Sequence, residues 1–595
     1  MQTPPLAERV RQLEEQMRIV NSKLSIPLAD TPPMNEDPEI HSPAKSFQGD
    51  SGFQAPIEAF NQSLHHVRQK MGIARVVSQS PTTPTIGSSL RRTCSNRQTT
   101  TIRVGSKTLP FPVEHAYQEY LDFYFTDINP CHPCISENDF RAKSAEMLSR
   151  TEIRQSEKCF LAVHYMIFAM ADMLREVRPP DQRGTSPGWQ WYQRAEDLVG
   201  RQKFMGQGDL SLLQYLIFEA FYLMHEDRPN GAYLISGVMC RLCFQFGLHQ
   251  QSRWAEPQNS FQQHQKQRIF WTAYFLDRRI ALSCGRPYGM NDRDIDTDEP
   301  AWLDDKELYP DRPLPAPRPE ASHCVYLACM IAFARFTGHI WDKMYAANTT
   351  NAAVDTEAIT ILDAQIRHWT DTVLPKTPLV PATREPEKRH LRQHLLVTTR
   401  FAHLRLLLRR RLMTSLTYSS QDAHITGQLA SDIVLQIVPS SDEANQPSSF
   451  RFHMTVSLGS AVLILATLLC RPLDEIQMQD HCPAYIERFR QALYILQQLG
   501  SGLQAARRVL DDLKDITNVV VALIEQPSPA QRSHQMALPQ DVNALFPYGA
   551  VDFAQQAGYV QEFYPVAEDV GYDWNTWNGI ASPAHGQHGY GAPWL

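Results

Sequence analysis

Apolar residues recur at three- and four-residue steps through most of the chain, from about residue 113 to residue 525. This spacing places the apolar side chains on one face of a helix, so it predicts a series of amphipathic helices. The predicted helices span residues 157–177, 190–203, 209–226, 231–246, 264–284, 321–346, 355–373, 389–415, 421–438, 451–471, 482–499 and 501–525. No run alternates for long enough to require a β-sheet. We therefore expect an all-α fold, with one large multi-helix domain over residues 113–525 and a Pro-rich insertion at 309–319.

The predicted helix at 264–284 is followed by an unusual order of residues. Gly285 is suited to a left-handed C-terminal cap, and Pro287 cannot continue a helix. A polar loop follows, and its acidic residues are Asp292, Asp294, Asp296, Asp298 and Glu299. We expect this loop to be solvated and to cap nearby helix N-termini. The preceding helix, 231–246, is expected to end at Gly247, with Leu248 folding back in a Schellman-type contact.

The N-terminal segment carries a heptad pattern, with apolar residues at alternating steps of four and three and charged residues on the flanks. The apolar residues are Leu6, Val10, Leu13, Met17, Val20 and Leu24. This pattern predicts a coiled coil over residues 1–27 and hence a homodimer, because an isolated helix this short is marginal without a partner. The alternative is a short, solvated amphipathic helix.

Two segments lose the helical pattern. Residues 28–112 are rich in Pro, Ser, Thr and Gln, which predicts a disordered linker. Residues 526–595 are predicted to be a disordered acidic-aromatic tail, with no Lys or Arg from Ser533 onwards. Interleaved acidic and aromatic residues are typical of activation segments that contact coactivators. The aromatic residues proposed for this role are Phe563, Tyr564, Tyr572, Trp574 and Trp577. An inert tail is the alternative.

Composition narrows the function classes. The net charge of −7 argues against the whole chain being a nucleic-acid binder, since such surfaces are usually basic. The 11 cysteines are scattered and the N-terminus has no apolar signal segment, so we expect a reducing, intracellular location. The most apolar run, Val456 to Cys470, is shorter than the ~20 helical residues that span a membrane. It predicts a buried core helix instead.

Three patterns suggest chemistry, and each lacks a necessary part. Cys131-His132-Pro133-Cys134 has redox or zinc spacing, but no βαβ pattern surrounds it, and the next pair, Cys240 and Cys243, lies within a predicted helix. The acidic loop resembles a calcium loop, but Thr297 and Leu303 stand where Gly and Glu are needed. We therefore expect no catalytic, cofactor or metal-binding residue in this chain.

The third pattern is typical of a different class of protein, an all-α enzyme. Asp511-Asp512-Leu513-Lys514-Asp515, together with Asn291, Asp292 and Glu299, resembles the two magnesium-binding motifs of all-α terpene synthases and prenyltransferases. The second motif lies between Pro287 and Pro300 rather than on a helix, and the order of the motifs is reversed. This magnesium-dependent enzyme remains the alternative function.

A family resemblance covers the region densest in these signals. FWTAYFLDRRIALSCGRPYGMNDRDIDTDEP resembles the signature of the fungal-specific transcription factor domain, or middle homology region, and GAYLISGVMCRLCFQFGLHQ resembles the family's preceding helix. The matching positions assigned a structural role are Arg241, Gly247, Trp271, Asp277, Arg278, Gly285, Arg286, Pro287, Asp294 and Asp296. We also expect Asp277 or Glu299 to pair with Arg241 or Arg286.

The resemblance implies a nuclear regulator of RNA polymerase II-dependent transcription that is not an enzyme and does not use a membrane. Its partners would be promoter DNA, coactivators and a small-molecule effector. Members of the family bind DNA through a six-cysteine binuclear zinc cluster. The first cysteine here is Cys94 and no C-x-x-C-x6-C array is present. We therefore expect this chain alone to bind DNA weakly or not at all, with zinc present only if an upstream cluster is missing from the gene model.

Overall fold

The computed structural model describes residues 52–71, 99–175, 186–206, 208–254, 259–346, 355–379, 388–441, 448–471 and 479–525. The predicted coiled coil and the acidic-aromatic tail lie outside these residues, as do residues 28–51 and 72–98 of the predicted linker. The chain divides into two units, Met1–Phe47 and Gln48–Leu595, and all the described residues belong to the second.

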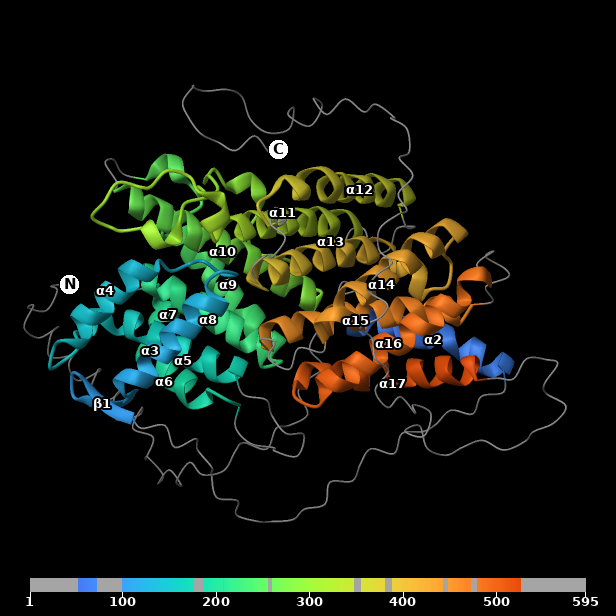
Figure 1. Cartoon of the computed structure of the whole chain (residues 1–595), viewed down its shortest axis with the longest axis horizontal. Coiled ribbons are helices and arrows are strands. Elements are labelled where there is room, and N and C mark those ends of the chain that lie inside the picture. Colours follow the sequence, from blue (N-terminus) through green and yellow to red (C-terminus); the bar gives the residue numbers. More distant parts are fainter. Residues whose placement is uncertain are drawn as a thin grey trace, which may run out of the picture. The chain divides into compact units, whose positions relative to one another are not determined.

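The prediction of an all-α domain is confirmed for the described residues (Figure 1). A first group of helices comprises α3 (Glu114–Phe123), α4 (Glu137–Leu148), α5 (Lys158–Arg175), α6 (Trp189–Val199), α7 (Gln202–Met205), α8 (Leu210–His225), α9 (Pro229–Gln245), α10 (Ser260–Cys284) and α11 (Cys324–Ile340). A second group comprises α12 (Thr356–His368), α13 (Lys388–Thr414), α14 (Ser420–Ser441), α15 (Ser448–Leu469), α16 (Cys482–Gly500) and α17 (Gln504–Ile524). Every range predicted to be helical contains one of these helices, with ends shifted by a few residues.

Short helical turns connect the longer helices. π-helical turns are η1 (Tyr124–Ile128), η7 (Trp341–Tyr345) and η8 (Trp369–Val373). The 3-10 turns are η2 (Gln155–Glu157), η3 (Gln251–Arg253), η4 (Asp292–Asp294), η5 (Asp305–Glu307), η6 (Pro319–Ala321), η9 (Leu374–Lys376) and η10 (Gln479–His481). The predicted Pro-rich insertion at 309–319 is the connection from η5 to η6.

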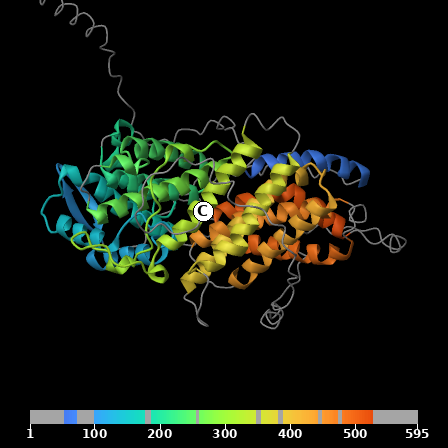
Figure 2. The ribbon, with the colours of Figure 1, turned by 90° about the horizontal axis from the view of Figure 1, so that it is seen from above.

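Each group is built around a helix that is apolar on all sides. In the first group this is α5, where a continuous run from Leu161 to Ala171 is fully buried under α6 and α8. In the second it is α15, which α13, α14, α16 and α17 surround. A helix that is hydrophobic all round is expected in such a position. Helix α11 packs on both α10 and α13 and so connects the two groups (Figure 2).

Two helices are long and apolar enough to cross a membrane by composition alone, Cys324–Tyr345 and Phe450–Leu469. Their apolar windows are 67% and 89% buried inside the protein. The run from Val456 to Cys470 lies in the second of them, α15, except for Cys470, which follows the helix. Burial by neighbouring helices accounts for the hydropathy of both segments.

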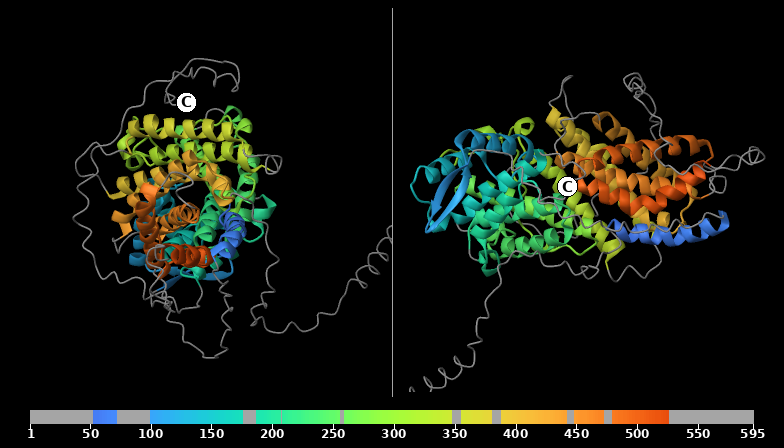
Figure 3. Two further views of the ribbon diagram at one scale, coloured as in Figure 1. Left: turned by 90° about the vertical axis from the view of Figure 1, so that its right-hand side faces the viewer. Right: turned by 90° about the horizontal axis from the view of Figure 1, so that it is seen from below.

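The predicted linker contains an ordered helix, so the prediction is wrong for that stretch. Helix α2 (Gln54–Met71) packs against α13 and α17, and Figure 3 shows it in blue alongside the second group. Ile57, Phe60 and Leu64 are buried and lie at steps of three and four. This short apolar stripe was outweighed in the sequence by the polar composition around it. Packing on a preformed bundle, rather than intrinsic propensity, stabilises such a helix.

The predicted linker also ends in a β-hairpin, so the prediction of disorder is wrong for this stretch as well. Strands β1 (Thr99–Val104) and β2 (Lys107–Pro112) pair antiparallel, with Val104 opposite Lys107. Gly105, at φ +58°, supplies the left-handed residue that a tight two-residue turn requires. Leu109 and Phe111 are buried and anchor the hairpin to the first group of helices.

Candidate functional site

Helix α10 positions the residues that the sequence singled out. It starts where the Asn259 side chain accepts a hydrogen bond from the backbone N–H of Phe261 at 2.9 Å. It ends at Gly285, with φ +63°. The N–H of Arg286 donates to the Ala281 carbonyl at 2.9 Å, which completes a Schellman motif. The predicted cap at Gly285 is thus present.

Helix α9 ends in the same way. Gly247 has φ +68°, and the N–H of Leu248 donates to the Cys243 carbonyl at 3.0 Å. Leu248 is fully buried, so the predicted fold-back of this residue is also present. The two caps set the direction in which the chain leaves α9 and α10.

Asp277 fixes the backbone that follows the Gly-Arg-Pro sequence. Its carboxylate is buried and accepts hydrogen bonds from the N–H groups of Gly289 at 2.8 Å and Met290 at 3.0 Å. A Cβ at Gly289 would lie 3.1 Å from the Cys240 sulfur, so a larger residue would be crowded here. Burial raises the pKa of Asp277, while Arg278 and the two N–H donors oppose that shift. Asp277 therefore acts as a structural acceptor.

Arg278 joins α10 to the acidic loop. Its guanidinium pairs with the Asp292 carboxylate at 2.6 Å and lies between the rings of Tyr274 and Tyr288, 3.7 and 4.5 Å from their centroids. The hydroxyl of Tyr274 donates to the same carboxylate. The side chain of Arg278 is fully buried, and its stacking and pairing match the planar geometry of a guanidinium.

The acidic loop contacts side chains and backbone of neighbouring segments. The indole N–H of Trp271 donates to the Asp298 carbonyl at 2.8 Å, and the hydroxyl of Ser252 donates to the Asp296 carboxylate. The N–H of Asp296 donates to the His249 carbonyl at 2.9 Å. Asp294 is exposed in η4. The loop therefore connects α10 to the end of α9, rather than capping helix N-termini as the sequence suggested.

The predicted pairing of Asp277 or Glu299 with Arg241 or Arg286 is wrong. Glu299 pairs with Arg335 at 2.7 Å. Arg241 donates to the Gly237 carbonyl, and Arg286 donates to the Asn230 side chain at 2.7 Å. The motif residues Arg241, Gly247, Trp271, Asp277, Arg278, Gly285, Arg286 and Pro287 all lie on or beside α9 and α10. Charge and spacing identified the region but not the partners.

The candidate metal motifs have other contacts. Among the described residues no group of three or more His, Cys, Asp or Glu side chains could hold a metal ion. Burial raises the pKa of the Cys134 thiol to about 12, so the thiolate that zinc or redox chemistry needs is disfavoured. Asp292 and Glu299, which the enzyme alternative would use for magnesium, are paired with Arg278 and Arg335.

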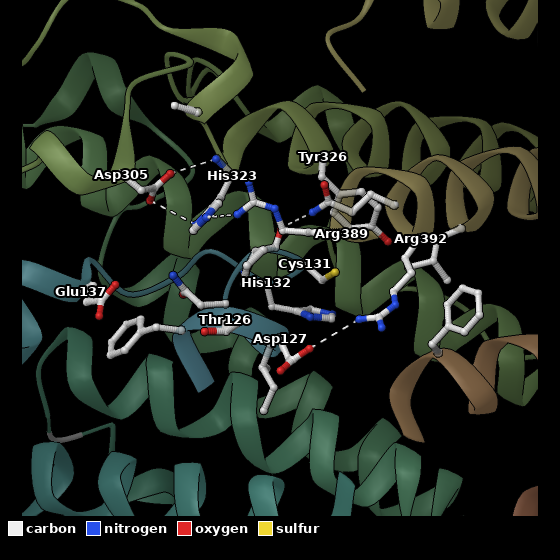
Figure 4. A pocket seen from close by; sticks show the side chains of 18 of the residues that line it. Thr126, Asp127, Cys131, His132, Glu137, Asp305, His323, Tyr326, Arg389 and Arg392 are labelled. Atoms are coloured by element: carbon white, nitrogen blue, oxygen red, sulfur yellow. Dashed lines mark hydrogen bonds and ion pairs between the residues drawn. The ribbon is translucent and has the colours of Figure 1, made fainter. Parts of the chain in front are cut away.

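A cavity of about 840 Å³ opens on the other side of α10, where the two groups of helices meet. Figure 4 shows part of its wall, with Asp127, His132, His323 and Arg392 among the labelled side chains. The lining comes from α3, η1 and the loop after it, α4, α8, α10, η5, η6, α11, α13 and α15. Its size is typical of a small-molecule site.

The carboxylates near the mouth are all paired with cations of the protein. Arg141 contacts Asp122 at 2.7 Å and Glu137 at 2.8 Å. The remaining four pairings in this zone are Asp127 with Arg392, Asp304 and Glu320 with Arg318, and Asp305 with the buried Arg268. Six carboxylates share four arginines in this outer zone, and Lys306 and Arg389 also line the cavity, so the net charge of the zone is close to zero.

The inner end of the cavity carries two arginines without a carboxylate partner among the described residues. Arg400 is 7% exposed and donates to the Tyr326 hydroxyl at 2.7 Å. Arg279 has neither a hydrogen bond nor an ion pair from its guanidinium to any described residue. Burial, and then the nearby charge of Arg400, lower the pKa of Arg279 to about 9, so it stays cationic at neutral pH. Arg279 is partly accessible and is one of the residues that line the cavity.

Neutral imidazoles surround these arginines. Burial, followed by the charge of Arg279, lowers the pKa of His132 well below its usual range and that of His225 to about 3. Burial and Arg400 do the same to His453. Neither ring nitrogen of His132 makes a hydrogen bond of ordinary geometry to a described residue, although the nearby Ile128 carbonyl opposes the pKa shift. The site therefore combines two fixed cations with neutral donors and acceptors.

The sequence alone does not reveal this cavity. Arg279 stands beside the motif residue Arg278, but nothing in the spacing separates their roles. Arg400 lies in a helix with many other basic residues. Consecutive residues of a helix lie about 100° apart around its axis. The predicted helix at 264–284 therefore places Arg278 and Arg279 in different directions, which is the one local signal that their surroundings differ.

Comparison with known proteins identifies the region that contains both the acidic loop and most of the cavity wall. Residues 121–371 match the family model of the fungal specific transcription factor domain. The chain carries a fungal specific transcription factor domain. This domain supplies α10, the acidic loop and most of the cavity wall, whereas α13 and α15 complete the cavity from beyond the match.

The curated relatives of this chain are named as transcriptional regulators. It is 22% identical over 401 residues to an uncharacterized transcriptional regulatory protein of Schizosaccharomyces pombe, covering 63% of this chain and 49% of that protein. It is 25% identical over 271 residues to an ABC-transporter-regulating transcription factor of Aspergillus oryzae, covering 45% and 29%. It is 26% identical over 210 residues to Activator of stress genes 1 of Saccharomyces cerevisiae, covering 34% and 21%. The chain thus spans half or less of the length of these relatives.

Proposed function

We propose that the chain is a fungal transcriptional regulator acting on RNA polymerase II-dependent genes in the nucleus, and that its helical domain responds to a small-molecule effector. The match of residues 121–371 to the fungal specific transcription factor domain carries the proposal. The cavity supports the effector-responsive part, because a polar, partly apolar-lined space of this size is suited to a ligand. The names of the relatives support the regulatory part.

The regulator works as a homodimer that reaches promoter DNA through a zinc cluster separate from this sequence. The heptad residues from Leu6 to Leu24 support the dimer, and changing Leu13 and Met17 to Asp should turn a sedimenting dimer into a monomer. The net charge of −7 opposes phosphate contact. Sequence-selective, nanomolar DNA binding by the 595-residue chain in physiological salt would contradict this division of labour.

The tail recruits coactivators. Tyr572, Trp574 and Trp577 offer large apolar surfaces that a coactivator groove can bury, and the acidic residues, with no Lys or Arg to balance them, keep the segment soluble. Phe563 and Tyr564 provide a second such pair.

A reporter assay tests the proposal. The whole chain, fused to an unrelated DNA-binding module, should change transcription from a promoter carrying that module's site. Changing Trp574 and Trp577 to Ala should lower this effect strongly. The matched changes of His585 and His588 to Ala should leave it intact, because they lie in the same tail without the large apolar surface. A reporter that stays at its basal level with the intact fusion would refute the regulatory function.

A further inference from the structure

The inner end of the cavity has an unbalanced charge that the rest of the fold does not neutralise. Seven Arg or Lys side chains and six Asp or Glu side chains line the whole cavity. All six carboxylates contact protein cations near the mouth, at Arg141, Arg318, Arg392 and Arg268. Of the four other cations in the lining, Lys306 is exposed and Arg389 contacts His323, whereas Arg279 and Arg400 have no carboxylate partner among the described residues. Buried charges are normally paired, so two neighbouring unpaired cations indicate a place for an anion.

The surroundings of the two arginines are otherwise apolar or neutral. Phe221, Leu396 and Phe450 line the cavity beside them, and Arg400 lies 5.4 Å from the centroid of the Phe275 ring. His132 is only 6% exposed, and neither of its ring nitrogens makes a hydrogen bond of ordinary geometry to a described residue. A neutral imidazole can donate one hydrogen bond and accept another. The inner end therefore offers charge, a hydrogen-bonding group and apolar surface within one space.

We propose that the inner end of this cavity binds a small organic carboxylate, with its oxygens between Arg279 and Arg400 and its apolar body against Phe221 and Phe450. The planar fork of a guanidinium matches the two oxygens of a carboxylate. His132 supplies a further polar contact. The inference deepens the proposed function, because it names the chemical class of the effector.

The geometry favours a carboxylate over a polyphosphate. The cavity as a whole has one excess positive charge, which is too little to balance a nucleotide carrying three or four negative charges. The volume of about 840 Å³ is far larger than an inorganic anion needs, and aromatic and aliphatic side chains fill part of its wall. An organic acid uses both the cations and the apolar surface.

Removing Arg279 provides a test whose sign distinguishes a ligand site from a structural residue. Arg279→Gln removes a partly buried cation that has no ion-pair partner among the described residues and lies near a second cation. In the ligand-free 595-residue protein we expect its thermal midpoint to rise by about 1–3 °C. The matched variant Arg318→Gln removes a cavity arginine that is paired with Asp304, and its midpoint should stay the same or fall. A clear drop for Arg279→Gln would assign the residue to the fold and overturn the site.

Binding is measured with 3-phenylpropionate as the probe, its neutral amide as the matched compound, and inorganic phosphate as the bare anion. We expect the carboxylate to raise the midpoint of the wild type by about 3–5 °C at saturating millimolar concentration, and the amide to leave it unchanged. In isothermal titration, Arg279→Gln should weaken binding about 10- to 100-fold, Arg279→Lys less, and Arg318→Gln about twofold or less. Equal stabilisation by phosphate, or none by any carboxylate, would overturn the proposal.

The reporter assay separates this inference from the function on which it rests. Adding the probe acid to cells should change the output of the wild-type fusion and leave that of Arg279→Gln unchanged. A fusion that regulates the reporter while the purified protein binds no carboxylate would refute the ligand class and leave the function standing. If the purified protein binds the carboxylate but the fusion never changes the reporter, the function is refuted and the ligand class stands.

Discussion

Arg278 and Arg279 are neighbours on α10 and have opposite surroundings. Arg278 is fully buried, stacked between Tyr274 and Tyr288, and paired with Asp292. Arg279 faces the cavity and has no partner among the described residues. One residue step turns the helix by about 100°, which is enough to move a side chain from the acidic loop to the cavity. Residue type and position in a motif therefore do not separate a structural arginine from a binding one; the presence of a carboxylate partner does.

A third arginine on the same helix shows how much that partner contributes. Arg268 is fully buried and pairs with Asp305 at 2.7 Å, and it also donates to the carbonyl of Pro133. The fold tolerates this cation deep inside because its charge is balanced. Arg268 and Arg279 thus form a comparison within one helix, which substitutions can break or sharpen.

Removing the partner of Arg268 should have the largest effect. Asp305→Ala would leave a buried cation without a carboxylate, which costs about 3–5 kcal/mol of the free energy of unfolding. Urea denaturation followed by circular dichroism would measure the loss. The exposed neighbour Glu307, in the same short turn, provides the control, and Glu307→Ala should change stability by less than about 0.5 kcal/mol. A similar small change for Asp305→Ala would contradict the role of the pair.

Acid should destabilise the folded protein through His225, which lines the cavity. Burial lowers the pKa of His225 to about 3 in the folded protein, against about 6.5 when unfolded. Between these values the unfolded chain binds a proton that the folded chain does not, so stability is full above pH 6.5 and falls as the pH drops. At pH 5 this histidine alone accounts for a loss of about 2 kcal/mol.

The variant His225→Phe isolates this contribution. It keeps the ring that stacks on Phe221 and removes the titrating nitrogen. The loss of stability between pH 7 and pH 5 should shrink by about 2 kcal/mol. Identical pH profiles for wild type and His225→Phe would show that the imidazole is protonated in the folded state.

The cap of α10 gives a smaller effect, since it depends on backbone conformation rather than charge. Gly285→Ala places a side chain at φ +63°, which should destabilise the protein by about 1–2 kcal/mol. Gly237 lies inside α9, where an added Cβ meets only the flexible end of Arg241 at 3.4 Å. Gly237→Ala should therefore stabilise by about 0.5–1 kcal/mol. The same chemical change with opposite signs, measured by thermal denaturation, tests the cap directly.

Features with local causes could be predicted from the sequence. The helices, the Schellman motif at Gly247 and the cap at Gly285 depend on periodicity and on single glycines within a few residues. Helix α2 and the hairpin of β1 and β2 were missed because the apolar positions that anchor them are few and lie in polar, Pro-rich surroundings. They are ordered because they pack against helices, which for α2 are distant in the sequence.

Contacts over long sequence separations could not be predicted. Charge alone allowed Asp277 to pair with Arg286, whereas the fold brings Asp277 to the N–H groups of Gly289 and Met290. The cavity is harder still, because its lining comes from both groups of helices. Arg279 and Arg400 come together only because the fold brings α10 and α13 to the same cavity. A sequence shows where the charges are, and the fold decides which of them remain unbalanced.

Arg286 provides the smallest test, at the exposed edge of the motif. Its guanidinium donates to the Asn230 side chain and lies 5.0 Å from the centroid of the Tyr233 ring, so it connects the end of α10 to the start of α9. A half-exposed contact of this kind contributes about 1 kcal/mol, far less than a buried ion pair. Arg286→Ala should thus lower the thermal midpoint by about 1–2 °C, and Arg293→Ala, in the exposed part of the acidic loop, should not change it. A loss as large as that of Asp305→Ala would mean that this motif arginine carries a buried pair after all, and would place it with Arg268 and Arg278 rather than at the surface.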